Sequence, residues 1–432
     1  MTRQAEHSSE APKAPSPAAA NSCDQEGASP AITRRQLLTQ VPATAVGLAA
    51  AAAVGTAVTV GGCSRNSGSG GAALNVLEVP VANVTTLESY KEVSKPTALY
   101  TLEEELELDA GTQLFGSGGA YAAALVPGKT ARPLSTVALL NLSSMSLHTV
   151  LDEPVGQDEG FNFHELRCSD SLLLWVESNF LTSEWRVYSA SIAEGGSSVS
   201  EPVLLDEGDG EYDAPEIAAL AGQAYWIVQP AEGGSKTQED SLIKTNGGVA
   251  YTSHGRFNGG LATSGSTLVC MPRAESDTGV YYQLTAIQGS GVVASQVLPH
   301  SFRPNTFTYV DGSFSFGIPA GYDYGDGIAN VGTYLCVGSN NWLRLTRTPL
   351  TPAGKLSGWL FCKSSSRTVF VDTAKQRYFT INPPSGSESY GDYAVCTGEL
   401  EGKLYLYSTV KNTGSKGTQR KVVLRSVQLK HI

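Results

Sequence analysis

Residues 171–178 read Ser-Leu-Leu-Leu-Trp-Val-Glu-Ser, and residues 185–192 read Trp-Arg-Val-Tyr-Ser-Ala-Ser-Ile. Both runs are short and rich in apolar, aromatic and β-branched residues, and polar residues separate them, which is typical of strands joined by a turn. The turn residues Ser169 and Asp170 precede the first run. Because the first run is continuously apolar, it predicts a strand that is buried on both faces.

Similar runs recur along the rest of the chain at a spacing of roughly forty to fifty residues. They are centred near Ala124, Trp175, Trp226, Val269, Phe316, Val369 and Leu406. A second strand usually follows each run, and several groups contain a third. We find no convincing amphipathic helix after residue 110, and the best helical candidate, residues 102–108, is short.

Seven groups of about four strands at this spacing resemble a β-propeller, in which sheets stack around an axis and bury both faces of their neighbours. The fold expectation is therefore an all-β propeller of seven blades over residues 74–432, with six or eight blades or a double β-sandwich as alternatives. The last group ends after three strands at the terminus, so we expect residues 74–79 to supply its missing strand and close the ring.

The N-terminal part carries a different signal. Residues 33–39 read Thr-Arg-Arg-Gln-Leu-Leu-Thr, an uncharged segment follows at 41–60, and Gly61-Gly62-Cys63 comes after it. Arg34 and Arg35 resemble the pair that the twin-arginine translocase reads, and residues 60–63 resemble a lipobox. The resemblance implies export in a folded state, lipid on Cys63 and a position on the outer face of the cell membrane. The alternative is an uncleaved single transmembrane anchor.

This interpretation divides the chain into three parts. Residues 1–62 form a disordered N-terminal region, export motif and apolar segment, residues 63–73 form the lipidated cysteine and a flexible tether, and residues 74–432 form the propeller. The net charge of −11 falls on the last two parts, since residues 1–62 hold four basic and four acidic side chains. No dense run of Lys or Arg is present, which argues against a nucleic-acid partner.

The sequence shows no motif that declares an enzyme. Gly-x-Ser-x-Gly is absent, and His164-Glu165 is not followed by a second histidine at metalloprotease spacing. The five cysteines beyond Cys63 (Cys168, Cys270, Cys336, Cys362 and Cys396) form no Cys-x-x-Cys pair. Since they lie in apolar runs, we expect free buried thiols, although disulfides are chemically allowed outside the membrane.

One acidic loop is a weak candidate for a calcium site. Residues 206–213 carry Asp206, Asp209 and Asp213 among glycines, and carboxylate oxygens are the ligands that calcium prefers. The spacing does not match the known twelve-residue calcium loop. A solvated turn is the favoured interpretation. Calcium therefore stays a weak candidate, and no cofactor is expected.

The connections between successive groups give the best candidates for a ligand site. In a propeller, the outer strand of one blade leads to the inner strand of the next near the axis, where such loops converge. Each of these connections pairs an aromatic residue with a polar one. The candidates are His164, Asp213, Asn258, Arg303 and Asp392, with Phe163, Tyr212, Phe257, Phe302 and Tyr390 as neighbouring aromatic residues. Turn capping and packing between blades are the competing explanation for each.

Two functions are open on this basis. The favoured one is a binding or assembly module on the cell surface, with a glycan, a peptide or a protein as ligand, because no catalytic group is signalled. The alternative is an extracytoplasmic polysaccharide hydrolase or lyase with Glu165 or Asp213 as acid–base group and His164 and Arg303 stabilising charge. Fold alone cannot separate the two functions.

Overall fold

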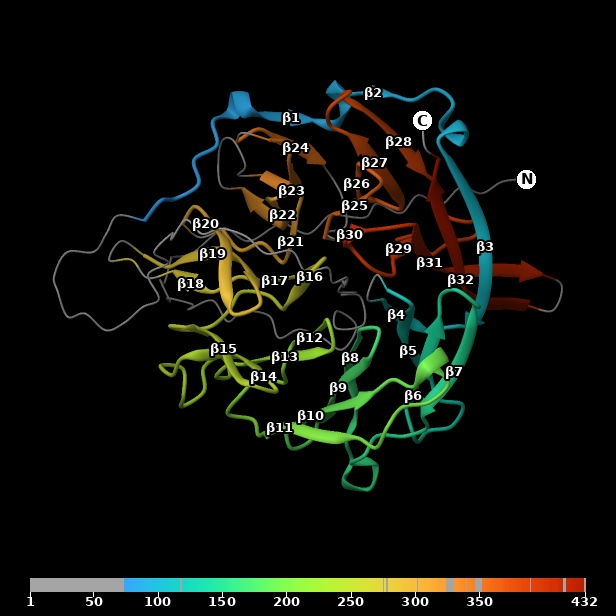
Figure 1. Cartoon of the computed structure of the whole chain (residues 1–432), viewed down its shortest axis with the longest axis vertical. Coiled ribbons are helices and arrows are strands. Elements are labelled where there is room, and N and C mark those ends of the chain that lie inside the picture. Colours follow the sequence, from blue (N-terminus) through green and yellow to red (C-terminus); the bar gives the residue numbers. More distant parts are fainter. Residues whose placement is uncertain are drawn as a thin grey trace, which may run out of the picture. The chain divides into compact units, whose positions relative to one another are not determined.

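Hydrogen bonding groups the strands into seven sheets arranged around one centre (Figure 1). The computed structural model describes residues 74–116, 119–274, 276, 279–300, 302–323, 330–338, 340–345, 352–388, 390–414 and 417–430. All of them belong to one compact unit, Val41–Ile432. Arg34, Arg35 and Cys63, on which the export and lipid predictions rest, lie outside the described residues.

The first three sheets follow one another along the chain. They contain β4 (Gln113–Gly116), β5 (Tyr121–Pro127), β6 (Ser135–Asn141) and β7 (Ser146–Leu151); β8 (Asn162–Cys168), β9 (Leu172–Asn179), β10 (Glu184–Ser191) and β11 (Val203–Gly208); and β12 (Ile217–Leu220), β13 (Gln223–Val228), β14 (Ser241–Thr245) and β15 (Gly248–Ser253).

The next two sheets are larger. They contain β16 (Ala262–Ser264), β17 (Thr267–Cys270), β18 (Arg273–Ala274), β19 (Tyr281–Gln288) and β20 (Gly291–Val297); then β21 (Thr306–Val310), β22 (Ser313–Asp323), β23 (Asn330–Cys336), β24 (Trp342–Leu345) and β1 (Val84–Thr86).

The last two sheets join the two ends of the propeller. They contain β25 (Gly354–Leu356), β26 (Trp359–Ser364), β27 (Arg367–Asp372), β28 (Arg377–Ile381), β2 (Lys91–Glu92) and β30 (Gly398–Leu400); then β29 (Tyr393–Ala394), β31 (Lys403–Gly414), β32 (Gly417–Leu429) and β3 (Tyr100–Asp109). The helices of the described residues are five short 3-10 turns: η1 (Val81–Asn83), η2 (Leu87–Ser89), η3 (Pro96–Ala98), η4 (Gln157–Glu159) and η5 (Glu194–Gly196).

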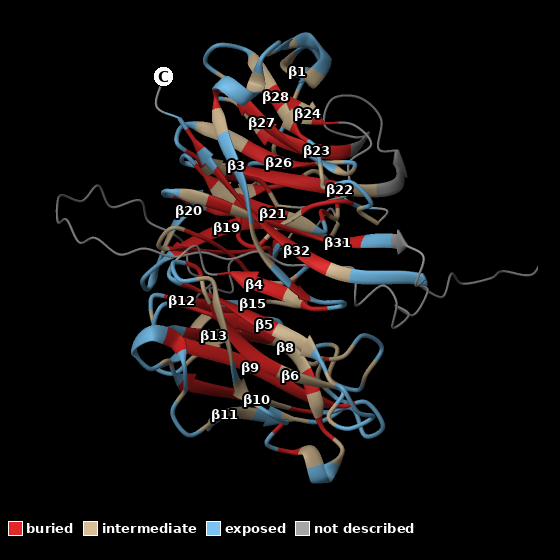
Figure 2. Ribbon diagram, turned by 90° about the vertical axis from the view of Figure 1, so that its right-hand side faces the viewer, coloured by how far each residue is buried: buried red, intermediate tan, exposed pale blue. Residues whose placement is uncertain are grey.

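Buried side chains between neighbouring sheets close the ring. Each of seven hydrophobic clusters draws side chains from two sheets that are consecutive around the ring. The seventh interface joins the last sheet to the first, because Leu114 of β4 packs with Leu424 of β32. Figure 2 shows the buried residues along the middle of the strands. The expectation of an all-β propeller is thereby confirmed, and the sheets number seven.

The strands that the sequence marks as most apolar are not the innermost ones. The innermost strands are short, and β8, β12, β16 and β21 contact one another in turn around the axis. The apolar runs form β5, β9, β13, β17, β22 and β31, each next to a short inner strand, whereas β27 lies one strand further out. A strand with neighbours on both edges and sheets on both faces is buried throughout, as β9 is.

Two sequence predictions about the start of the propeller are wrong. The ring is closed by β3, which pairs antiparallel with β32, and not by residues 74–79. Residues 102–108, the helical candidate, lie within β3. Its alternating glutamates meet lysines of the neighbouring strands, because Glu103 and Glu105 pair with Lys403 and Glu107 pairs with Lys421. These partners from the far end of the chain stabilise an acidic segment as a strand.

Residues 74–99, here called the strap, run along the outer edges of three sheets before β3 begins. Val76 forms a parallel bridge with Val297, β1 pairs in parallel with β24, and β2 pairs in parallel with β28. In Figure 1 the strap is the blue segment at the rim. It therefore adds an outer strand to the fifth and sixth sheets.

One strand crosses toward the axis. β30 lies between β29 and β31 in the sequence, yet it joins the sixth sheet by pairing in parallel with β25, and it also contacts β16 and β21. Gly398 fits there only as glycine, because its φ is +84° and a Cβ would lie 2.8 Å from Ser264 Cα. Glu399 accepts a hydrogen bond from the Asp311 backbone N–H at 2.7 Å. This end of the axis is therefore filled by protein.

One further prediction concerns residues that the structure describes. All five cysteines beyond Cys63 are free thiols, four of them buried, as expected. Within the part of the chain that the structure describes, no helix has the length and apolar character needed to cross a membrane.

Candidate functional site

The loops that lead from the outermost strand of one sheet to the innermost strand of the next are here called the crossover loops. The predicted site residues lie in these loops or directly after them, as expected from propeller geometry. Asp213, Asn258, Arg303 and Asp392 precede β12, β16, β21 and β29, and His164 lies near the start of β8. They therefore belong to the same end of the propeller, opposite to the end that β30 fills.

An ionic cluster lies where the innermost strands of the second and third sheets meet. The carboxyl group of Glu165 contacts the guanidinium of Arg167, whose side chain is fully buried, while that of Glu165 is 11 % exposed. Glu216, directly before β12, acts electrostatically on Glu165 and is itself influenced by Arg167. A Cβ at Gly260 would lie 2.6 Å from Glu216 Oε2, so Glu216 reaches toward the next crossover loop. We call Glu165, Arg167 and Glu216 the axial cluster.

The local sequence explains how this cluster forms. Glu165 and Arg167 are two residues apart in a strand, so their side chains point to the same face. A register shift between Phe163 and Glu165 means that the His164 side chain need not follow the regular alternation of side chains between the two faces of the sheet. The backbone of Ile217 also hydrogen-bonds to Glu165, which ties β8 to the start of β12.

Burial controls the ionisation of the two glutamates. Desolvation raises the pKa of Glu165 to about 8, although Arg167 opposes this shift. Desolvation also raises the pKa of Glu216, again opposed by Arg167. Glu216 nevertheless keeps solvent-accessible surface. At neutral pH the cluster therefore offers a carboxylic acid that donates a hydrogen bond, a solvent-accessible carboxyl group and a guanidinium.

The crossover loops around the cluster are joined by polar contacts. Asp213 accepts a hydrogen bond from Arg256 at 2.5 Å and from Gln229 at 3.2 Å. Asn258 Nδ2 donates to the Pro304 carbonyl at 2.6 Å, across to the next loop. These residues hold the loops in place, so the structural explanation applies to Asp213 and Asn258.

Arg303 is also held by its own surroundings. Its guanidinium lies over the ring of Tyr282 at 4.3 Å and donates to the Phe302 carbonyl at 3.1 Å. It makes no contact with the axial cluster among the described residues. The predicted role of Arg303 next to Glu165 is therefore not supported by its position.

His164 lies beside an exposed aromatic residue. Its ring meets Phe180 edge-on with 6.2 Å between ring centroids, and burial lowers the pKa of His164. Phe180 is 56 % exposed and belongs to the turn between β9 and β10. A neutral imidazole and an aromatic face therefore lie side by side near the axial cluster.

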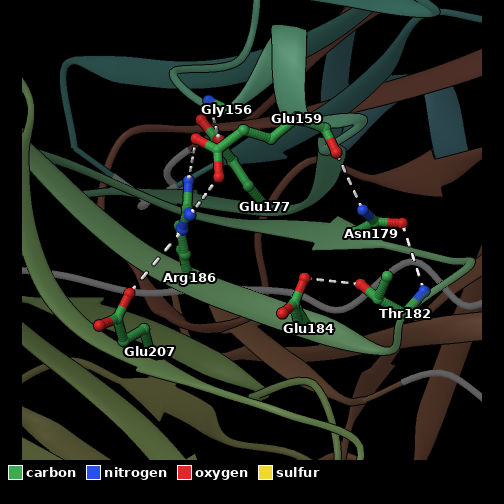
Figure 3. A network of polar contacts seen from close by, with 8 residues as sticks. All are labelled: Gly156, Glu159, Glu177, Asn179, Thr182, Glu184, Arg186 and Glu207. Carbon is green, nitrogen blue, oxygen red and sulfur yellow. Dashed lines mark hydrogen bonds and ion pairs between the residues drawn. The ribbon is translucent and has the colours of Figure 1, made fainter.

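A polar network supports this turn and the crossover loop before β8 (Figure 3). Glu177 accepts hydrogen bonds from the backbone N–H groups of Val155 and Gly156, at 2.7 and 2.9 Å. Asn179 Nδ2 donates to the Glu159 carbonyl at 3.0 Å, and Arg186 binds both carboxylate oxygens of Glu159. This network fixes the approach to His164 without using its side chain.

Asp392 forms a second buried cluster away from solvent. Its side chain is fully buried and pairs with Arg425, while the Lys363 ammonium donates to the carbonyls of Tyr390 and Asp392. Burial raises the pKa of Asp392 and lowers the pKa of Lys363 to about 8. This arrangement joins the sixth and seventh sheets, so Asp392 is a structural residue rather than a ligand-facing one.

The calcium hypothesis is not supported. Asp206 accepts hydrogen bonds from Trp226 Nε1 and Lys244, Asp209 accepts one from the Glu211 backbone, and Asp213 pairs with Arg256. Within the described ranges, no group of three or more His, Cys, Asp or Glu side chains is placed to hold a metal ion. The three carboxylates point to different protein partners.

The sequence interpretation missed Arg167 and Glu216. Both are single charged residues at the edge of apolar runs, in Leu166-Arg167-Cys168 and Pro215-Glu216-Ile217. The signal that could have identified these residues was a charged side chain in or next to a short inner strand, because a buried charge requires an oppositely charged partner. The partner lies on another sheet, so spacing alone could not identify it.

The comparisons with known proteins concern the fold and not the function. No family model and no curated protein matches the chain. Among solved structures, a prolyl endopeptidase aligns with TM-score 0.46 and 11 % identity over 71 % of this chain and 46 % of its own. The acylaminoacyl peptidase of Pyrococcus horikoshii aligns with TM-score 0.42 and 10 % identity, over 79 % and 54 %.

A third structure is a propeller alone. The β-propeller domain of the Trilobed protease from Pyrococcus furiosus aligns with TM-score 0.45 and 9 % identity, over 77 % of this chain and 96 % of that domain. This chain spans about half the length of the two peptidases above. Similarity at this level concerns the arrangement of strands and carries no activity to this chain.

Proposed function

We propose that this protein is a ligand-binding module of the extracytoplasmic cell surface, and that its ligand contacts the axial cluster at the crossover-loop end of the propeller. The observation that carries this proposal is the placement of Glu165 and Arg167 on the inner strand β8, with Glu216 directly before β12. Closing the ring does not require ionisable groups there, since seven apolar clusters already join the sheets. Ionisable groups kept in a desolvated place, as Glu165 and Arg167 are, are candidates for a functional site.

The chemistry of the cluster favours a polyhydroxylated ligand. The protonated carboxyl of Glu165 donates a hydrogen bond, a carboxyl oxygen of Glu216 accepts one, and sugar hydroxyl groups can bind both. The exposed ring of Phe180, next to His164, offers a flat apolar surface of the kind on which a sugar ring can stack. A cell-wall glycan is therefore the first ligand to test, with peptides as the alternative.

Replacing Glu216 by glutamine should weaken glycan binding by about 5- to 100-fold, because the amide nitrogen that replaces a carboxyl oxygen leaves a hydroxyl donor of the ligand without an acceptor, which costs about 1–3 kcal/mol. The measurement is the affinity of the full chain for an array of bacterial cell-wall glycan fragments. Glu401→Gln is the matched control, since Glu401 lies in the turn before β31 at the opposite end. An affinity that is equal in wild type and Glu216→Gln, or no binding to any glycan or peptide, contradicts the proposal.

One observation favours the enzymatic alternative. A carboxyl with a pKa near 8 is suited to donate a proton to a leaving group at neutral pH. Glu165 would then act as general acid in a polysaccharide hydrolase or lyase, with Glu216 or Asp213 as the second carboxyl. Mass spectrometry of glycan products separates the two functions: turnover that Glu165→Gln abolishes while binding persists establishes an enzyme.

We further propose that the twin-arginine route exports the folded protein and that a lipid on Cys63 holds it at the membrane. The strap begins at Leu74, so residues 64–73 would link the lipid to the rim of the propeller. Intact mass of membrane-extracted protein should correspond to loss of residues 1–62 plus a diacylglyceryl group. The mass of the unprocessed chain would contradict the lipid anchor and support the transmembrane alternative.

A further inference from the structure

We propose that a groove between the strap and β20 binds an extended peptide from a partner protein, which adds as a strand to the open edge of β20. The groove has a volume of about 830 Å³ and lies away from the axial cluster. Its lining consists of Leu74–Glu78 of the strap, Ala294–Gln296 of β20, and residues of the fifth sheet. This site is independent of the proposed glycan site.

The edge of β20 is available for pairing. β20 forms its ladder with β19 on one side. On the other side, the only pairing within the part of the chain that the structure describes is at Val297, whose carbonyl accepts a hydrogen bond from the Leu77 N–H at 2.8 Å. Strand alternation then directs the backbone groups of Ser295 outward as well. β20 carries no charged residue and no proline, the usual devices that prevent an edge from pairing.

The next two sheets show the geometry that such a strand would take. β1 adds in parallel to the outer strand β24, and β2 adds in parallel to β28. In the fourth sheet, the strap pairs with the outer strand β20 through a single bridge, between Val76 and Val297. A partner peptide would therefore continue a mode of pairing that the strap already uses, which is known as β-augmentation.

The floor of the groove can receive side chains of the peptide. Tyr309 and Phe314 lie with ring centroids 4.9 Å apart, and Trp342 and Cys336 complete an aromatic and apolar surface. Glu78 is the one charged residue of the lining, so an acidic peptide is disfavoured. The expected ligand is an extended segment with alternating apolar side chains and a neutral or basic character.

The test uses a random nonapeptide library displayed on phage and selected on the full chain. We expect enriched peptides whose affinity falls at least tenfold in Ser295→Pro, because proline removes the outward N–H but is tolerated on an edge strand. Trp342→Ala should weaken the same peptides by removing the floor. The axial variant Glu216→Gln serves as the matched control and should bind them as wild type does.

Two results would overturn the inference. One is a selection that enriches no peptide, or peptides that bind Ser295→Pro as tightly as wild type. The other is protection of the Ser295 amide from hydrogen exchange in the full chain without any peptide, since this would show that the chain itself occupies the edge. Loss of glycan binding in Ser295→Pro is not expected, so the two proposals fail independently.

Discussion

Asp392→Ala is expected to lower the free energy of unfolding by about 3–5 kcal/mol, the range for breaking a buried ion pair by removing one partner. The substitution leaves Arg425, which is 8 % exposed, and the buried Lys363 without their carboxylate. Both cations would then remain in a place from which water is excluded. Chemical unfolding followed by tryptophan fluorescence measures the loss.

Glu388→Ala is the matched control for this variant. Glu388 pairs with Arg420 at 2.7 Å, but both side chains are more than a third exposed. Exposed ion pairs contribute about 0–1 kcal/mol, so this variant should unfold close to wild type. Equal losses in Asp392→Ala and Glu388→Ala would show that water reaches the Asp392 cluster.

Glu165→Gln is expected to remove a pH dependence of stability between about pH 4.5 and pH 8. The folded-state pKa of Glu165 is raised from 4.5 to about 8, so the folded state holds the proton more tightly than the unfolded state. The stabilisation is therefore fully present at low pH and is lost as the pH rises through this window. One such group changes the free energy of unfolding by up to about 1.4 kcal/mol per pH unit.

The measurement compares unfolding midpoints of wild type and Glu165→Gln at several values from pH 5 to pH 8.5. Glu216 and Asp392 also have raised pKa values, so wild type alone would mix their contributions. The difference between the two proteins isolates Glu165, and Glu401→Gln serves as a control for the loss of one negative charge. Parallel pH profiles for wild type and Glu165→Gln would contradict the raised pKa.

Sequence patterns were sufficient to predict the propeller for a physical reason. A strand enclosed by neighbours on both edges and both faces is apolar along most of its length, and β9, with Leu172, Trp175 and Val176, has this signature. The pattern could not identify the innermost strands, because strands as short as β16 carry too few residues to show a period. The pattern also did not identify β3 as a strand, because its glutamates are stabilised by lysines more than 290 positions away in the sequence.

The candidate site residues lie where the sequence analysis expected loops to converge, and their role in binding a ligand stays a prediction. His164 and Asp213 lie at one end of the propeller. Whether a polar residue faces a ligand or a protein partner depends on contacts between sheets, which sequence spacing does not contain. Asp392 is the example, since Arg425 and Lys363 bury it completely.

The protonation of Glu165 at neutral pH decides what the axial cluster offers a ligand. A carbon-13 NMR titration of the full chain, labelled at glutamate carboxyl groups and assigned by the resonance missing in Glu165→Gln, tests this protonation directly. The account predicts that this resonance titrates with a pKa of about 8. A pKa near the ordinary glutamate value of 4.5 would contradict it.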